Sequence, residues 1–163
     1  MFQRNRQVVF HQPPPGPLGP GIDQLAAVDE EIWPGSRFPA RDLECLTIFL
    51  TVSGAATTSV AGHTANHQAG AIVAIAGGAR FEESIGDDAW WHVRYLMLAG
   101  PWTKPIDAAL HAHASASAFY PEAPPAWRQR VTSAVHLALR QPAHWQWQVA
   151  SLLTATCADL LLH

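Results

Sequence analysis

The hydrophobic and polar residues of this chain change period along its length, and each period predicts a different element. Over residues 45–53, "CLTIFLTVS", apolar and polar positions alternate, which is typical of a β-strand with one buried face. "TTSVAGHTANHQAG" predicts a hairpin that turns at residues 61–62, and "AIVAIAGG" predicts a short buried strand closed by two glycines. "ARFEESIGDDAWWHVRYLMLAG" predicts two further strands about a turn at residues 86–88. Short strands separated by turns favour an antiparallel barrel or sandwich.

After Pro101 the apolar period becomes helical. A helix is predicted from Ala126 to Arg140, ended by Pro142, because apolar residues recur every four positions at Trp127, Val131, Val135 and Leu139. "AHWQWQVASLLTATCADLLLH" predicts a second helix that runs to the end of the chain. The predicted fold class is therefore mainly β, of the α+β kind, with an antiparallel barrel or jelly roll followed by two C-terminal helices.

The N-terminal part differs from both patterns. "HQPPPGPLGPG" contains too much proline and glycine for a helix or a central strand. We therefore expect residues 1–40 to form a flexible arm, residues 41–105 the barrel, and residues 106–163 a helical segment of the same domain.

Composition narrows the class of protein. A chain of 163 residues that is 48% hydrophobic and 14% charged can bury one sizeable core, so we expect a single domain. The net charge is −3 and Lys104 is the sole lysine, which argues against direct binding of nucleic acid. Cys45 and Cys157 lie far apart and are expected to be free, largely buried thiols. With neither a leader sequence nor an apolar run of about 20 residues, we expect a cytoplasmic protein that does not contact membranes.

The strand "DDAWWHVRYLML" carries the candidate binding residues. One face holds Trp90, His92 and Arg94, and the other holds Trp91 and Tyr95. If the first face points into the lumen, a polar molecule could stack and form hydrogen bonds there. The ligand-binding set would then be Phe49, Thr51, Phe81, Glu83, Trp90, His92 and Arg94, with Glu83 paired to Arg94. Alternatively, Glu83, His92 and Arg94 form an exposed polar face, and the alternation alone does not decide between the two.

Two sequence patterns resemble known families. "TVSGAATTSVAGHTANHQAGAIVAIAGGARF" resembles the cupin pattern, and Trp91, Tyr95 and the "AGP" at residues 99–101, followed by two amphipathic helices, resemble the sensor half of AraC-type transcription regulators. This resemblance covers about Leu46 to Leu162. It implies an effector inside the barrel, bound by the aromatic strand, and thereby favours the face of His92 and Arg94.

The last helix could merely cover the barrel, but the resemblance to AraC-type sensors implies a two-fold dimer through this helix. The predicted interface residues are Val149, Leu152, Leu153, Thr156 and Leu160.

The metal ligands of cupins are mostly missing. Where the resemblance implies a His-x-His pair the chain has residues 57–60, "TTSV"; the glutamate position falls near His63, and the later histidine is Phe81. His111 and His113 have His-x-His spacing but no third ligand close in sequence. We therefore expect no metal, no cofactor and no enzymatic activity.

The function predicted from the resemblance is that of an effector-sensing and dimerisation domain. Its effector would be a small organic molecule such as a sugar or an organic acid, and DNA would be contacted only through a further C-terminal domain that this chain lacks. The alternatives are a stand-alone cupin enzyme and a small-molecule-binding protein unconnected with transcription.

Overall fold

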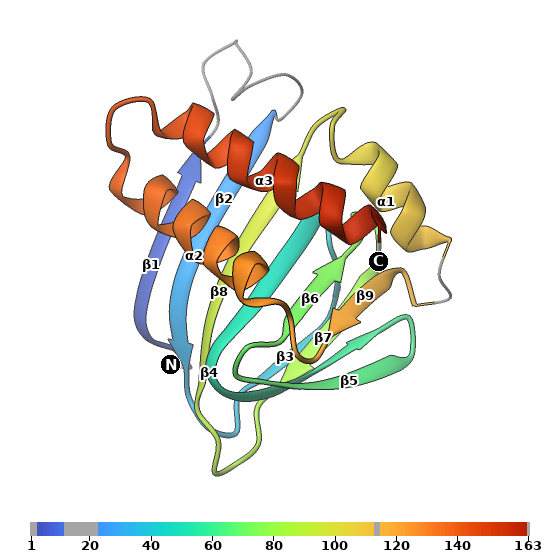
Figure 1. The fold of residues 1–163 in the computed structure, drawn as a ribbon. Coiled ribbons are helices and arrows are strands. Elements are labelled where there is room, and N and C mark those ends of the chain that lie inside the picture. Colours follow the sequence, from blue (N-terminus) through green and yellow to red (C-terminus); the bar gives the residue numbers. More distant parts are fainter. Residues whose placement is uncertain (1–2, 12–22, 113–114, 163) are drawn as a thin grey trace.

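The computed structural model describes residues 3–11, 23–112 and 115–162, which form nine strands and three helices (Figure 1). The strands are β1 (Gln3–His11), β2 (Gln24–Ile32), β3 (Arg37–Asp42), β4 (Leu46–Val60), β5 (His63–Gln68), β6 (Ile72–Ile75), β7 (Arg80–Ser84), β8 (Trp91–Ala99) and β9 (Ser117–Tyr120). The helices are α1 (Lys104–His111), α2 (Pro125–Arg140) and α3 (Trp145–Leu162).

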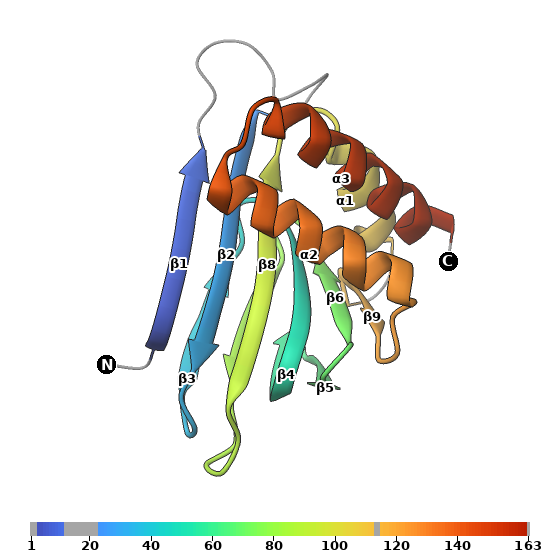
Figure 2. The same ribbon diagram turned by 60° about the vertical axis from the view of Figure 1, so that its left-hand side comes forward.

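The strands form two antiparallel sheets that share β4. In the first sheet the order is β1-β2-β8-β4-β6-β9, and in the second β3 pairs with β7, which pairs with β4, which pairs with β5. The lumen lies between these sheets. Helices α2 and α3 lie side by side over the outer face of the first sheet, as the two views in Figures 1 and 2 show.

Gly54 allows β4 to pass from one sheet to the other. The register of β4 against β8 shifts between Thr51 and Ser53, and Gly54 follows with φ at +76°. A Cβ atom at Gly54 would lie 1.6 Å from the carbonyl oxygen of Trp90, so no other residue fits here without a backbone shift. Before the shift all residues from Leu46 to Thr51 are buried, whereas beyond it only Ala56, Thr58 and Val60 of β4 are buried.

The predicted fold class is confirmed. The strands expected between residues 45 and 99 are present, the hairpin turns at Ala61 and Gly62, and the two expected C-terminal helices are α2 and α3. A third helix, α1, was not predicted, because its eight residues "KPIDAALH" bury only Ile106 and Leu110 and give too short a period.

The flexible arm expected over residues 1–40 is not what the structure shows for residues 24–40. β2 pairs with β8 along its whole length and buries Leu25, Ala27 and Val28, while β3 begins at Arg37. The segment is therefore part of the sheets. The proline-rich stretch at residues 12–22 lies outside the described residues.

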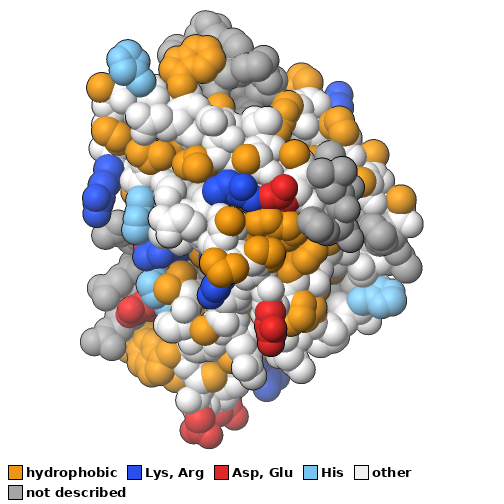
Figure 3. Space-filling model, viewed as in Figure 1, with side chains coloured by type: hydrophobic (Ala, Val, Ile, Leu, Met, Phe, Trp, Pro, Cys, Tyr) orange, Lys and Arg blue, Asp and Glu red, His pale blue; other side chains and the backbone are white. Residues whose placement is uncertain are grey.

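The helix side of the molecule shows many hydrophobic side chains among few charged ones over α2 and α3 (Figure 3). Below this surface, α2 buries Trp127, Val131 and Val135 toward the sheet. An ion pair between Arg130 and Asp159 links α2 to α3. No helix among the described residues is both long and apolar enough to cross a membrane.

Candidate functional site

The candidate site is a cavity of about 310 Å³ between the two sheets. Its lining comes from five strands and combines an aromatic wall with a few polar groups: Glu30, Ile32, Phe38, Arg41, Leu43, Thr47, Phe49, Phe81, Glu83, Trp91, Tyr95 and Met97. Arg41, Leu43 and Met97 also line a neighbouring hollow of about 590 Å³, which adjoins the ends of β2 and β8. These three residues therefore stand at the boundary between the lumen and a wider mouth.

The aromatic wall is centred on Phe49 of β4. Its ring centroid lies 5.1 Å from that of Tyr95, 6.2 Å from that of Phe81 and 6.4 Å from that of Trp91. Such tilted ring pairs form a rigid apolar surface. Tyr95 adds a hydroxyl, so the wall can bind a flat or apolar ligand body beside a polar group.

Two carboxyl groups are buried at the polar end of the lumen. Glu30 of β2 is 4% exposed and Glu83 of β7 is 5% exposed. Arg41 Nη2 donates a hydrogen bond to Glu83 Oε2 at 3.3 Å, whereas Glu83 Oε1 has no hydrogen-bond partner among the described residues. Burial raises the pKa of Glu83 to about 7; the charge of Arg41 lowers this pKa in part, and Glu30 raises it further.

The guanidinium group of Arg41 lies against aromatic rings as well as against Glu83. Its Cζ atom is 4.5 Å from the ring centroid of Phe81 and 5.6 Å from that of Phe38. Phe38 and Arg41 are three residues apart, so in a regular strand they would face opposite sides. A register shift between them in the pairing of β3 with β7 brings both side chains to the lumen.

The structure brings three of the seven predicted ligand-binding residues to the lumen, namely Phe49, Phe81 and Glu83. Thr51 lies behind the wall, where the indole Nε1 of Trp91 donates a hydrogen bond to its hydroxyl at 3.1 Å. Trp90 is 43% exposed and packs on Trp33, with ring centroids 5.9 Å apart.

His92 and Arg94, the remaining two, point away from the lumen, so the predicted Glu83–Arg94 pair does not form. Glu83 pairs with Arg41, and Arg94 pairs with Asp29. Asp29 lies directly opposite Arg94 in the pairing of β2 with β8 and fixes it on the outer face. Trp91 and Tyr95 face inward instead. The prediction treated β8 without β2, because residues 1–40 were expected to be an arm.

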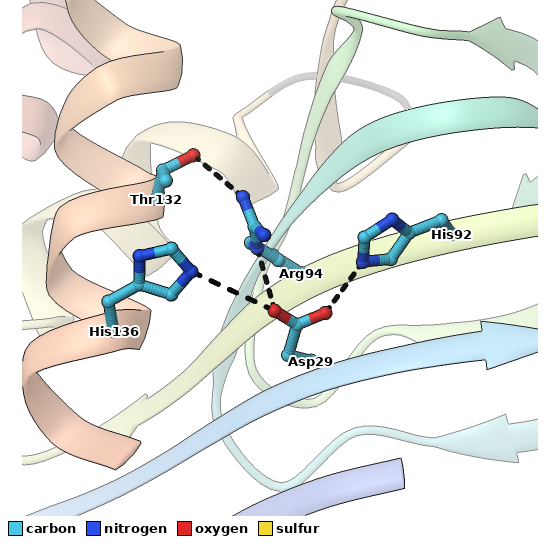
Figure 4. Close-up of polar contacts among 5 residues, drawn as sticks. All are labelled: Asp29, His92, Arg94, Thr132 and His136. Carbon is cyan, nitrogen blue, oxygen red and sulfur yellow. Dashed lines mark hydrogen bonds and ion pairs between the residues drawn. The ribbon is translucent and has the colours of Figure 1, made fainter. Parts of the chain in front are cut away.

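The outer face of β8 carries a polar cluster beneath α2 (Figure 4). His92 Nε2 lies 2.6 Å from Asp29 Oδ1, and Arg94 Nε donates to Asp29 Oδ2 at 2.9 Å. Arg94 Nη1 also reaches the hydroxyl of Thr132 on α2 at 3.5 Å, and His136 Nε2 lies 3.9 Å from Asp29 Oδ2. Burial alone would raise the pKa of Asp29, but the hydrogen bonds from Arg94 and His92 outweigh it and lower that pKa.

His67 is a buried residue that the sequence analysis did not single out for the site. Only 1% of it is exposed, even though it lies in the hairpin of β4 and β5. Its Nδ1 lies 2.8 Å from the Thr51 hydroxyl and its Nε2 lies 2.8 Å from the Thr58 hydroxyl. Burial lowers the pKa of His67 to about 4, so the ring is neutral at pH 7. This network fixes Thr51 and, through it, the indole of Trp91 in the lumen wall.

The predicted dimer residues on α3 are mostly covered within the single chain. Val149, Leu153 and Thr156 are each buried at 2% exposure or less, because α3 packs on α2 and α1. Leu152 is half-buried, and the side chain of Leu160 lies outside the described residues. The prediction followed the apolar stripe of α3, and this stripe is the one that packs inward. Trp147 is instead the most exposed large hydrophobic residue of the described chain, at 64%.

The other candidate groups are dispersed. His63 is exposed at the start of β5, His111 Nε2 donates a hydrogen bond to the carbonyl of Gly77 at 2.8 Å, and His113 lies outside the described residues. Across residues 23–112 and 115–159, no three histidine, cysteine, aspartate or glutamate side chains come together as a metal site would require. Cys45 and Cys157 are free thiols, as predicted.

No protein-family model matches the sequence, and comparison with curated proteins gives no match. Among solved structures, a cupin 2 conserved barrel domain protein from Leptotrichia buccalis superposes with a TM-score of 0.46 and 8% identity, over 58% of this chain and 41% of that one. The Cnp3 cupin domain of Schizosaccharomyces pombe gives 0.44 and 16% identity, over 65% and 74%.

A mutant of the Bacillus subtilis oxalate decarboxylase gives a TM-score of 0.42 and 13% identity, over 47% of this chain and 22% of that one. The chain thus spans about a fifth of the length of that enzyme. These structural neighbours are cupin-domain proteins, and at such TM-scores the superpositions do not bear on the chemistry of the lumen.

Proposed function

We propose that this chain is an effector-binding and dimerisation module of the AraC type, which holds a small organic molecule in the lumen and performs no catalysis. The lumen supports this function most directly. It is a cavity of about 310 Å³ in which aromatic rings surround a few polar groups, and a wider hollow adjoins it. Such a combination is typical of sites for small organic ligands.

The AraC-type part of this proposal rests on the sequence resemblance. The aromatic strand with Trp91 and Tyr95, the "AGP" at residues 99–101 and the two following amphipathic helices occur in the order of those sensors. In this proposal the protein is cytoplasmic, and DNA is contacted only through a domain outside this chain. A ligand that binds one arrangement of the module more tightly than another would shift the population between them.

The dimer would form through the outer face of α3. Val149, Leu153 and Thr156 are buried within the chain, which leaves Trp147 and the half-buried Leu152 as the large apolar side chains available to a second copy within residues 145–159. Light scattering coupled to size-exclusion chromatography tests this directly. The native chain should run as a dimer and Trp147→Ser as a monomer, whereas a native chain that is monomeric at every concentration would remove dimerisation from the proposal.

Thermal unfolding against a panel of sugars, organic acids, amines, aromatic compounds and divalent metals tests ligand binding. A ligand at 100 times its dissociation constant adds about 2.7 kcal/mol to the free energy of unfolding. We expect an organic compound to raise the melting temperature. Phe49→Leu in the lumen should weaken its binding, while His92→Gln on the outer face should leave the affinity unchanged.

Two results would contradict the proposal. Stabilisation by a divalent metal alone, with metal found in the purified protein by elemental analysis, would favour a stand-alone cupin enzyme. An organic ligand whose affinity falls in His92→Gln but not in Phe49→Leu would place binding on the outer face and remove the lumen from the function.

A further inference from the structure

The charges that line the lumen are unequal. Among the described lining residues, Glu30 and Glu83 carry carboxyl groups, and Arg41 is the one cationic side chain. Both carboxyl groups are more than nine-tenths buried, while the side chain of Arg41 is 47% exposed. A buried carboxylate is costly unless a positive charge or hydrogen-bond donors compensate it. Among the described lining residues, carboxyl groups therefore outnumber cationic side chains.

The carboxyl group of Glu83 is only partly compensated by hydrogen bonds. Its Oε2 accepts from Arg41, but its Oε1 is fully buried and has no hydrogen-bond partner among the described residues. Because Glu83 also lines the cavity, a ligand that enters the lumen would lie beside this carboxyl group. A positively charged N–H donor would supply both a hydrogen bond to Glu83 and a second positive charge in the lumen.

The position of Arg41 shows that a cation fits between Glu83 and Phe81. Its guanidinium group contacts the Glu83 carboxylate and lies 4.5 Å above the ring centroid of Phe81. A carboxylate beside an aromatic face is the setting in which organic cations are recognised. Arg41 stands on β3, which pairs only with β7 among the described strands, and lines both the lumen and the outer hollow. Its side chain can therefore move toward solvent, which would leave the space beside Glu83 and Phe81 to a ligand.

An anionic ligand is disfavoured by the same geometry. It would meet two buried carboxyl groups, and Arg41, the one cation of the lining, is already paired with Glu83. Like charges at short range repel strongly in a site from which water is excluded.

We propose that the ligand of the lumen is a small organic cation, with an ammonium or guanidinium group at Glu83 and an apolar body against the wall of Phe49, Phe81 and Trp91. This inference rests on the proposed function, since it names the class of molecule that the lumen holds. It replaces the sugar or organic acid expected from the sequence.

Calorimetric titration with three probes of equal size separates charge from shape. We would use benzylammonium chloride, benzyl alcohol and sodium benzoate at about pH 8, where Glu83 is mostly ionised. Benzylammonium should bind at least about tenfold more tightly than benzyl alcohol, and benzoate more weakly than either.

Three variants locate the effect. Glu83→Gln keeps the shape of the side chain and should weaken benzylammonium about tenfold, while Glu82→Gln, its exposed neighbour on the opposite face, should change it less than about twofold. Arg41→Met removes the internal cation and should strengthen benzylammonium severalfold. Melting temperature and circular dichroism of each variant show that it is folded.

The outcomes distinguish the ligand class from the proposed function. If benzoate or benzyl alcohol binds as tightly as benzylammonium, or if benzoate binding is lost in Arg41→Met, the lumen still binds small molecules but the cation is wrong. If neither these probes nor any organic compound of the thermal panel binds, the proposed function fails together with the ligand class. Benzylammonium binding that Glu83→Gln leaves intact would also overturn this inference.

Discussion

The two faces of strand β8 differ in how the charges beside them are compensated. On the outer face, His92 and Arg94 both contact the carboxylate of Asp29, at 2.6 Å and 2.9 Å. On the lumen side, Glu83 has one contact of 3.3 Å with the half-exposed Arg41, and its other oxygen has no partner in the described chain. The outer charges thus have partners within the protein, whereas one oxygen of Glu83 has none among the described residues.

This difference distinguishes the polar cluster on the outer face of the first sheet from the polar groups of the lumen. A compensated cluster beneath a helix holds the helix to the sheet, and replacing its members changes stability. An uncompensated carboxylate in a cavity lowers stability and persists where a ligand uses it.

The largest expected effect is on the pH dependence of stability, and it comes from Glu83. Burial raises the pKa of Glu83 from 4.5 to about 7. Between those pH values the folded chain keeps a proton that the unfolded chain has lost, so the free energy of unfolding falls as pH rises through this window, by up to about 3 kcal/mol.

Denaturant unfolding of the native chain and of Glu83→Gln, at several pH values between about 4 and 8, measures this effect as a difference between two curves. The difference should grow with pH in favour of Glu83→Gln and level off above about pH 7. Glu82→Gln, exposed on the other face, should follow the native curve. A constant difference at all pH values would mean that Glu83 ionises normally, and the contrast between the two faces would disappear.

The next effect in size breaks the outer cluster. Asp29→Ala leaves the Arg94 guanidinium group and the His92 ring without their carboxylate partner beneath α2, and we expect a loss of about 2 kcal/mol, less than for a fully buried pair because Asp29 is 20% exposed. Calorimetric titration of the lumen ligand should give an unchanged affinity in this variant. A large loss of affinity with intact folding would show that the two faces are coupled.

The buried histidine network has a smaller effect. Thr58→Val keeps the side-chain shape but removes the partner of His67 Nε2, which should cost about 1 kcal/mol. Thr57→Val is a matched control, because the Thr57 hydroxyl forms a surface hydrogen bond to Asn66 and should change stability by less than about 0.5 kcal/mol. Equal losses in both variants, measured by denaturant unfolding, would contradict the assignment of His67 to the support of the lumen wall.

His67 also gives a pH dependence of opposite sign to that of Glu83. Its pKa falls from 6.5 to about 4 on burial, so the unfolded chain binds a proton that the folded chain does not. Stability is lost as pH falls from about 6.5 toward 4. The native chain should therefore show partly cancelling slopes, which is why the Glu83→Gln difference curve is needed to resolve either one.

Sequence periodicity predicted the strands and helices better than it predicted which strand faces line the lumen. Strands from residue 45 onward and both long helices follow from alternation and four-residue spacing, which depend on local positions alone. Which face of β8 lines the lumen depends on its partner β2, and that strand was hidden by the proline-rich stretch before it. The apolar run of residues 25–28 with Ile32, in "LAAVDEEI", was the available signal for β2.

Arg41 and Glu30 were missed for related reasons. Arg41 reaches the lumen through a register shift in β3, and a period of two cannot reveal such a shift because it reverses the facing of every later residue. Glu30 lies on the same strand as Asp29 and was likewise assigned to the arm. Phe49, Phe81 and Glu83 are the three predicted residues that line the lumen.

The smallest effect concerns how far the outer cluster extends onto α2. His136 lies 3.9 Å from Asp29 and its side chain is 40% exposed. Burial and the nearby Arg94 lower its pKa, which disfavours the charged form and weakens its attraction to the carboxylate. His136→Ala should change the free energy of unfolding by less than about 0.5 kcal/mol, as should Ser133→Ala on the same helix. A loss near that of Asp29→Ala would instead make His136 a full member of the cluster, and α2 would then be held by charge as much as by the packing of Trp127, Val131 and Val135.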